Sequence, residues 1–273
     1  MKIVTALLFC LISTIANASN FTELKTPKSK YLVKAPKITI ALPLSYEKEL
    51  TKKYPVFYVL GGELNGELVN AMLNRLHLSN GSNEHIIINI TSNNRLRDLA
   101  PTVNKDPRGP VGEGGGGDLF LDFLEKELMP QIAKNYRTND FNVLAGHSLA
   151  GLLVIHSFQS RPTLFQSHLA FSPAVWWGER ETSAAAKKYV KSRKQVPTYL
   201  YMAIGNEGGE MQDVYNSLTQ TLVRNRHLNS SLLLDEFDND SHDFTMVAGL
   251  YSALKGLYRY QRKKENHKAH IRH

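Results

Sequence analysis

The chain has 273 residues and a formal net charge of +8 at pH 7, a length that suits one large α/β domain. Much of the excess charge lies in residues 262–273, where Arg262, Lys263, Lys264, Lys268 and Arg272 stand against Glu265 alone. No aromatic residues alternate with these charges, so the composition argues against nucleic-acid binding. We expect a solvated, frayed tail; contact with membrane headgroups or, through its histidines, with a metal is the alternative.

The first residues have the features of a secretory signal peptide. Lys2 gives a positive start, residues 3–12 are apolar, and Ala16-Asn17-Ala18 is a small-x-small cleavage site. We predict that residues 1–18 are removed and that residues 19–273 form a single domain, periplasmic or secreted. A membrane anchor needs about 20 apolar residues, so no stable membrane insertion is expected. The only cysteine, Cys10, lies in the removed segment, so the mature chain has no disulfide.

Strand-like and helix-like stretches alternate along the rest of the chain. The predicted strands are residues 31–43, 54–60, 85–90, 141–145, 166–172, 199–204 and 231–234. The predicted helices are residues 67–77, 118–136 with Asp118 as N-cap, 149–158, 179–191, 212–225 and 243–262. Because the strands are too apolar to have a wet face, we expect an α/β fold with a mostly parallel central sheet and helices on both faces.

A glycine-rich segment, residues 109–117, contains a G-x-G-x-x-G pattern at Gly112, Gly114 and Gly117. The pattern follows a polar loop and not a strand, and it lacks the GK[ST] of a phosphate-binding loop. It therefore argues against nucleotide binding, and no cofactor is predicted. A mobile loop near the mouth of a site is the favoured interpretation.

The most informative stretch is Gly146-His147-Ser148-Leu149-Ala150-Gly151. It joins an apolar strand to a helix and matches the G-x-S-x-small pattern of a nucleophile elbow, with alanine where glycine is usual. The serine of such a turn sits at a strained corner, so its neighbours must be small. The following helix points its N-terminal amides at the reacting centre. An ordinary tight strand-to-helix turn is the alternative.

A serine nucleophile needs a base, and usually an acid to orient that base, in the chain order Ser, Asp or Glu, His. His242 lies in a loop between the last strand and the closing helix, so we predict that it is the base. The acid is expected directly after the preceding strand. Glu207 is the first choice there, Glu210 the second, and Asp213 a distant third.

An oxyanion hole takes one amide from the residue after the nucleophile, here Leu149. A second amide comes from the loop after an early strand. Gly62 and Glu63 are the candidates in this chain, with Glu63 preferred.

With these residues in place, the chain resembles the α/β-hydrolase "putative esterase" family, which includes esterase D, mycolyltransferases and the enterobactin and trilactone siderophore esterases. Four stretches carry the resemblance: residues 54–62 (YPVFYVLGG), 94–101 (NRLRDLAP), 120–128 (FLDFLEKEL) with the elbow, and 172–177 (SPAVWW). Gly61 stands where relatives often carry Asp. The resemblance implies the α/β-hydrolase fold and ester hydrolysis through an acyl-serine, with no metal required.

The resemblance also implies site roles. Arg95 would contact an anionic or catecholate-like substrate, whereas Arg97 pairs with a carboxylate structurally. Trp176 and Trp177 either line an aromatic pocket or belong to the core. The implied substrate is a siderophore ester; a short-chain or carbohydrate ester, an acyltransferase reaction, and a non-catalytic ligand-binding relative are the alternatives.

Overall fold

The structure, a computed structural model, describes residues 21–25, 28–107, 109–192, 196, 198–225 and 231–271, with side chains described as far as residue 267. The predicted signal peptide, residues 1–18 with Cys10, lies outside the described residues. None of the described helices is both long and apolar enough to cross a bilayer.

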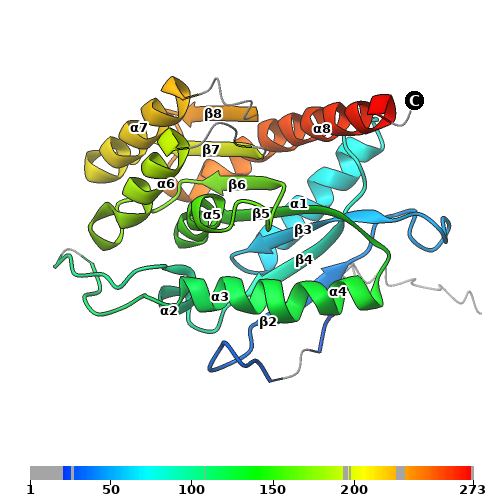
Figure 1. Cartoon of the computed structure of the whole chain (residues 1–273), viewed down its shortest axis with the longest axis horizontal. Helices are drawn as coiled ribbons and strands as arrows, with labels where there is room; N and C mark the ends of the chain where they lie inside the picture. The colour runs from blue at the N-terminus through cyan, green and yellow to red at the C-terminus, as the bar shows by residue number, and fades with distance from the viewer. Residues whose placement is uncertain are drawn as a thin grey trace, which may run out of the picture.

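The described residues form one eight-stranded sheet in the order β1-β2-β4-β3-β5-β6-β7-β8 (Figure 1). The strands are β1 Thr22–Glu23, β2 Lys37–Ala41, β3 Tyr54–Leu60, β4 Ile86–Thr91, β5 Thr138–His147, β6 Ser167–Phe171, β7 Tyr199–Gly205 and β8 Ser231–Phe237. The pairs β1–β2 and β2–β4 are antiparallel and all others are parallel. The mostly parallel sheet of the predicted α/β-hydrolase fold is confirmed.

Helices cover both faces of this sheet, as predicted (Figure 1). One face carries α3 Gly117–Phe123, α4 Met129–Asn135, α5 Leu149–Ser160, α6 Glu181–Ser192 and α7 Gly209–Arg224, and the other carries α1 Glu63–His77 and α8 Thr245–Ile271. Shorter elements are α2 Arg95–Leu99, the π-helical turn η1 Leu124–Leu128, and the 3-10 turns η2 Gly178–Arg180 and η3 His242–Phe244.

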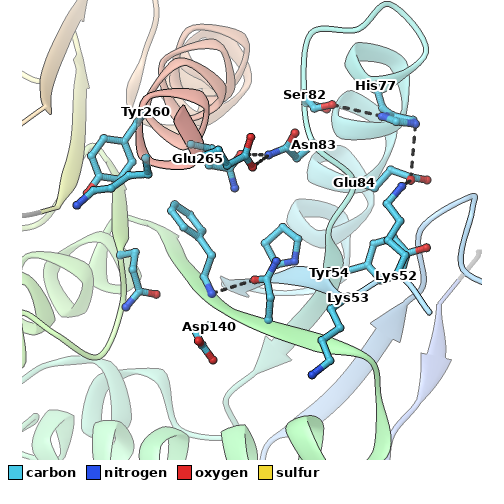
Figure 2. Close-up of a pocket in the computed structure, with 16 residues that line it drawn as sticks. Lys52, Lys53, Tyr54, His77, Ser82, Asn83, Glu84, Asp140, Tyr260 and Glu265 are labelled. Atoms are coloured by element: carbon cyan, nitrogen blue, oxygen red, sulfur yellow. Dashed lines mark hydrogen bonds and ion pairs between the residues drawn. The ribbon is translucent and has the colours of Figure 1, made fainter. Parts of the chain in front are cut away.

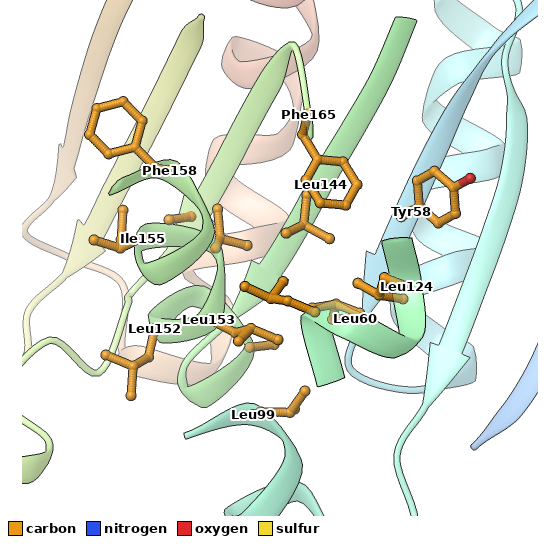
Figure 3. Packing of buried hydrophobic residues seen from close by; sticks show 14 of the residues in the cluster. Tyr58, Leu60, Leu99, Leu124, Leu144, Leu152, Leu153, Ile155, Phe158 and Phe165 are labelled. Carbon is orange, nitrogen blue, oxygen red and sulfur yellow. The ribbon is translucent and has the colours of Figure 1, made fainter. Parts of the chain in front are cut away.

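Strand β3 shows why the sheet is buried on both sides. All its residues are buried, and they alternate between two cores as the two-residue period of a strand requires. Tyr58 and Leu60 belong to the core under α3 to α7, whereas Phe57 and Val59 belong to the core under α1 and α8. Figure 3 shows the first core, where Phe165 meets Tyr58 edge-on with 5.8 Å between ring centroids.

Several element ends differ from the prediction. Helix α3 begins at Gly117 with Gly116 as its N-cap, so Asp118 lies in the first turn and its prediction as N-cap is wrong. Helix α1 begins at Glu63, four residues early, because Gly62 supplies the N-cap position at a positive φ of 103°. Helix α8 continues to Ile271, so the tail is helical and not frayed, although residues 262–267 are exposed.

The glycine-rich segment packs against α2 and is hydrogen-bonded to the loop that follows α2. An isolated bridge joins Val103 to Gly114, and the Gly116 N–H donates to the Arg97 carbonyl at 2.9 Å. A side chain on Gly114 would place its Cβ 2.3 Å from the Thr102 carbonyl oxygen. Glycine is therefore required at this position because two backbone segments approach closely. The mobility that the sequence suggested for this loop stays a prediction.

Two histidines are buried among apolar side chains. His168 in β6 lies between Phe158 and Phe165 and within 3.4 Å of the Ser157 hydroxyl. Burial lowers the pKa of His168 from 6.5 to about 3, and that of His85 from 6.5 to about 4. Both rings are therefore neutral in the folded protein at neutral pH.

Stability should fall with acid partly through these rings. The unfolded chain protonates them near pH 6.5 and the folded chain does not, so the stability they contribute is complete above pH 6.5 and is lost as pH falls. Each ring should add a slope of about 1.4 kcal/mol per pH unit. In urea unfolding between pH 6 and pH 4, His168→Gln should lose stability less steeply than the wild type by about that slope. Parallel curves would show that His168 does not titrate differently in the two states.

Candidate active site

Ser148 occupies the strained corner that its motif predicts. Its φ and ψ are 61° and −119°, between the end of β5 and the start of α5, a region that costs a non-glycine residue on the order of 1–3 kcal/mol. The close approach of α5 to the sheet explains the flanking glycines. A Cβ on Gly146 would lie 2.6 Å from the Ala150 carbonyl carbon, and one on Gly151 would lie 3.0 Å from Pro173 Cα. Ala150 is tolerated because its methyl group occupies the space left free by Gly146.

The predicted oxyanion donors lie at neighbouring strand ends. Leu60 of β3 pairs with Gly146 of β5, so the Gly61–Glu63 loop lies beside Ser148 and Leu149. Glu63 and Leu149 are the first residues of α1 and α5, where backbone amides are not used within the helix. The partial positive ends of two helices therefore meet at this edge. The Glu63 side chain is exposed and paired with Lys37, so the backbone amide is the group that this residue can offer the site.

Glu207 and His242 form the pair predicted from chain order. They follow β7 and β8, and His242 Nδ1 lies 2.9 Å from both Oε1 and Oε2 of Glu207. The Glu207 side chain is 6% exposed and that of His242 33%. Because a carboxylate can only accept, Nδ1 carries the proton and Nε2 is left as a base.

The two loops that carry this pair are joined by their backbones. The Asn206 N–H donates to the Asp240 carbonyl at 2.8 Å. A Cβ on Gly205 would stand 2.5 Å from that same carbonyl oxygen. The glycine at the end of β7 therefore lets the loop with Glu207 approach the loop with His242.

The other candidate acids lie elsewhere. Glu210, the second choice, lies in the first turn of α7 and accepts from Arg180 Nε at 2.7 Å. Asp213 is one turn further along α7 and is exposed. The structure therefore separates Glu207, which contacts the imidazole, from Glu210, which holds an arginine. The sequence ranked Glu207 above Glu210 only by its position directly after the strand, and it gave no sign that Glu210 pairs with Arg180.

Ser148 and His242 lie at the same carboxyl edge of the sheet. His147, next to the serine, donates from Nε2 to the His242 carbonyl at 2.8 Å, and the two rings are 4.6 Å apart. Burial lowers the pKa of His147, which keeps this donor ring neutral. Among the described residues no direct hydrogen bond joins Ser148 to His242; such bonds are often long before substrate binds.

Ser172 is a site residue that the sequence analysis did not assign. It follows β6 directly, is fully buried and has a φ of 39°. Its hydroxyl donates to Glu207 Oε1 and lies 2.8 Å from Thr245 Oγ1. Its position in the sequence could have identified it. A polar residue directly after a buried parallel strand lies at the same edge of the sheet as Ser148.

The two arginines have different environments, as predicted. Arg97 donates from Nε to Oδ1 of the buried Asp98 at 2.7 Å. Arg95 begins α2 and is exposed, and its Nη1 lies 3.9 Å from the point where a Cβ on Gly61 would stand. No carboxylate pairs with Arg95 within the part of the chain that the structure describes. A cation with no carboxylate partner among the described residues therefore lies beside the candidate oxyanion loop.

The tryptophans also differ from each other. Trp177 is 2% exposed and donates from Nε1 to the Thr102 carbonyl at 2.8 Å. Its proposed role in lining a pocket is therefore wrong, because its ring belongs to the core and its polar atom is already bonded. Trp176 is partly exposed and remains available to a ligand.

Among the described residues, a cavity lies at the opposite edge of the sheet. It has a volume of about 510 Å³ and is lined by residues at the amino ends of β3 and β5, with Tyr260 and Lys264 from α8 (Figure 2). Its charges are mixed and none of its lining residues belongs to the elbow. Among the described residues, no group of three or more histidine, cysteine or acidic side chains is placed to hold a metal ion.

Curated relatives match part of this chain. It is 30% identical to a siderophore triacetylfusarinine C esterase of Aspergillus fumigatus over 171 residues, which are 58% of this chain and 57% of that protein. It is 36% identical to the ferri-bacillibactin esterase BesA of Bacillus subtilis over 95 residues, which are 32% of this chain and 33% of that protein. The matched stretch therefore spans less than two thirds of each relative.

Solved structures match over most of the chain. An IroE-like serine hydrolase from Shewanella oneidensis superposes with a TM-score of 0.80 at 28% identity, covering 88% of this chain and 80% of that one. The BES protein of Bacillus cereus superposes with a TM-score of 0.75 at 24% identity, covering 94% and 98%, and so shares the fold. Residues 29–253 match the family described as "Putative esterase", and the chain belongs to that family.

Proposed function

We propose that this protein is a serine esterase that cleaves carboxylic esters through an acyl-serine intermediate. The observation that carries the proposal is the hydrogen bond between Glu207 and His242 Nδ1, at the edge where Ser148 stands in a strained elbow. A carboxylate on Nδ1 leaves Nε2 free to take a proton. Membership of an esterase family supports the same chemistry.

In the proposed reaction, Ser148 Oγ attacks the ester carbonyl while His242 Nε2 takes the hydroxyl proton. The carbonyl oxygen becomes an oxyanion that the amides of Leu149 and Glu63 stabilise, with Gly62 as the other candidate. The C–O bond to the alcohol then breaks, and the alcohol leaves with the proton from Nε2. Water repeats the sequence on the acyl-serine and releases the acid. Each oxyanion donor typically contributes about 3 kcal/mol to barrier lowering.

The substrate that we propose is a siderophore ester of the trilactone type. One curated relative is named as a siderophore esterase and another as a ferri-bacillibactin esterase. The exposed Arg95 beside the oxyanion loop suits an anionic or catecholate group. Arg95 has no carboxylate partner in the described chain, so its charge is available to a ligand. Trp176, which is partly exposed, would offer an aromatic face to the same group. A simple acyl ester as substrate, or an alcohol in place of water as acceptor, would use the same catalytic residues.

The nucleophile and the substrate can be tested together. Wild type and Ser148→Ala would be assayed on p-nitrophenyl acetate, a ferric trilactone siderophore and a panel of simple acyl esters. Loss of the attacking oxygen should lower kcat at least about 10³-fold on every ester. The trilactone should have the highest kcat/KM of the panel. Equal activity of the two proteins would reject the mechanism, and no preference for the trilactone would reject the substrate.

The acid can be tested with a matched pair of glutamates. Glu207→Gln should lower kcat by about 10²- to 10⁴-fold, because an amide can present a donor to Nδ1 and favour the wrong tautomer of His242. Glu210→Gln removes the same charge three residues away, where the carboxylate holds Arg180. It should change kcat less than about twofold. Equal losses in both variants would show that the loop, and not the carboxylate on Nδ1, is what matters.

We also propose that the protein acts outside the cytoplasm, on the basis of the leader-like composition of residues 1–18. Removal of that segment would make Ser19 the first residue of the mature chain. N-terminal sequencing of the protein recovered from periplasmic and culture fractions of its host should give Ser19. Recovery of the intact Met1 chain from the cytoplasm alone would contradict this.

A further inference from the structure

Ser172 is held in an unfavourable backbone conformation at a place where its hydroxyl is useful. Its φ of 39° is in the left-handed region, yet it is not glycine, and it is fully buried. Its backbone N–H already donates to the Ala203 carbonyl at 2.8 Å, so this N–H needs no partner from the side chain. Glycine would adopt this conformation with less strain. The presence of serine there therefore points to a role for its side chain.

The number of protons available determines to which partner the Ser172 hydroxyl donates. A serine hydroxyl has one proton, and Ser172 Oγ has two partners, Glu207 Oε1 and Thr245 Oγ1. The charged acceptor forms the stronger bond, so Ser172 donates to Glu207. Glu207 then receives one proton from Ser172 and one from His242 Nδ1. Two donors, one from the loop after β6 and one from the segment after β8, thus set the rotation of one carboxylate.

Thr245 completes the arrangement from the other side. It is fully buried, three residues after His242, where the 3-10 turn η3 passes into α8. Its hydroxyl lies 2.8 Å from Ser172 Oγ and 3.4 Å from the Ser241 carbonyl oxygen. Thr245 therefore links the segment that carries His242 to the hydroxyl that holds Glu207.

We propose that Ser172 and Thr245 are positioning residues, which hold the Glu207 carboxylate in the one rotation that accepts His242 Nδ1–H. The proposal rests on the proposed function, because it assumes that His242 is the base. Without the Ser172 hydroxyl, Glu207 Oε1 loses its second donor and the buried carboxylate turns away from the imidazole ring. His242 then spends less time with Nε2 directed at Ser148. The effect falls on the chemical step and not on substrate binding.

The first test compares serine variants. Ser172→Ala should lower kcat about 10- to 100-fold, a loss typical of residues that orient a catalytic group, with KM within about twofold. Ser157→Ala is the matched control, because Ser157 is an equally buried serine whose hydroxyl contacts His168 in the core. Its kcat should stay within about twofold of the wild type. A kcat for Ser172→Ala equal to that of Ser157→Ala would overturn the proposal.

The second test uses Thr245 and protects the first against misfolding of a Ser172 variant. Thr245→Val keeps the shape and removes the hydroxyl, and should lower kcat about 3- to 10-fold. Thr245→Ser keeps the hydroxyl and should recover most of that loss. If Thr245→Ser lost as much activity as Thr245→Val, packing and not the hydroxyl would be the cause, and the role of Thr245 would be rejected.

A readout without turnover separates this proposal from the proposed function. The His242 Nδ1–H proton, in a hydrogen bond to a carboxylate, should give a downfield ¹H NMR signal that is absent in Glu207→Gln. The signal should move upfield or broaden in Ser172→Ala and remain unchanged in Ser157→Ala. Those changes in a protein without esterase activity would reject the proposed function alone. An active enzyme whose signal is the same in Ser172→Ala would reject the positioning role alone.

Discussion

The contact between the start of α5 and the carboxyl end of β5 is the constraint on which the rest of this edge depends. At residue 146 there is no space for even one carbon atom beyond the backbone, and residue 151 faces the loop after β6 almost as closely. This approach forces Ser148 into its positive φ and fixes the first amides of α5 at the sheet edge. Strand β3 is hydrogen-bonded to β5, so the position of β5 also determines where the Gly61–Glu63 loop lies.

The remaining site residues reach this corner through the order of the parallel strands. β6, β7 and β8 follow β5 in sequence and in space, so the loops after them lie side by side. Backbone contacts then draw the loops together: the Ser148 N–H donates to the Phe171 carbonyl at 3.0 Å and the Asn206 N–H to the Asp240 carbonyl at 2.8 Å. The candidate site, spread over nearly a hundred residues of sequence from Ser148 to His242, is thus built from neighbouring strand ends, which is the usual place for sites in such sheets.

The features that depend on hydrophobic periodicity and on glycine positions could be predicted from the sequence. The features that depend on side-chain packing could not. The strand at residues 54–60 was predicted with its correct bounds, since an uninterrupted apolar run between polar loops has few other solutions. Helix α2 was not predicted because five residues are too few to show a period. Trp176 and Trp177 are adjacent and chemically identical, so only the fold could place one ring in the core. Ser172 was overlooked for the same reason, because its importance lies in the contacts of its hydroxyl with Glu207 and Thr245.

The position of strand β8 at an edge of the sheet bears on how the protein could pair with another strand. It is one of the two edge strands of the described sheet and is only half buried, so one row of its backbone groups has no neighbouring strand among the described residues. Near its carboxyl end the strand contains Asp235 and Glu236, and the Tyr201 hydroxyl donates to Asp235 Oδ2 at 2.8 Å. Acidic side chains at a sheet margin discourage two copies from pairing edge to edge, since like charges would meet. Asp235 and Glu236 thus disfavour the addition of a second copy of β8 along this edge.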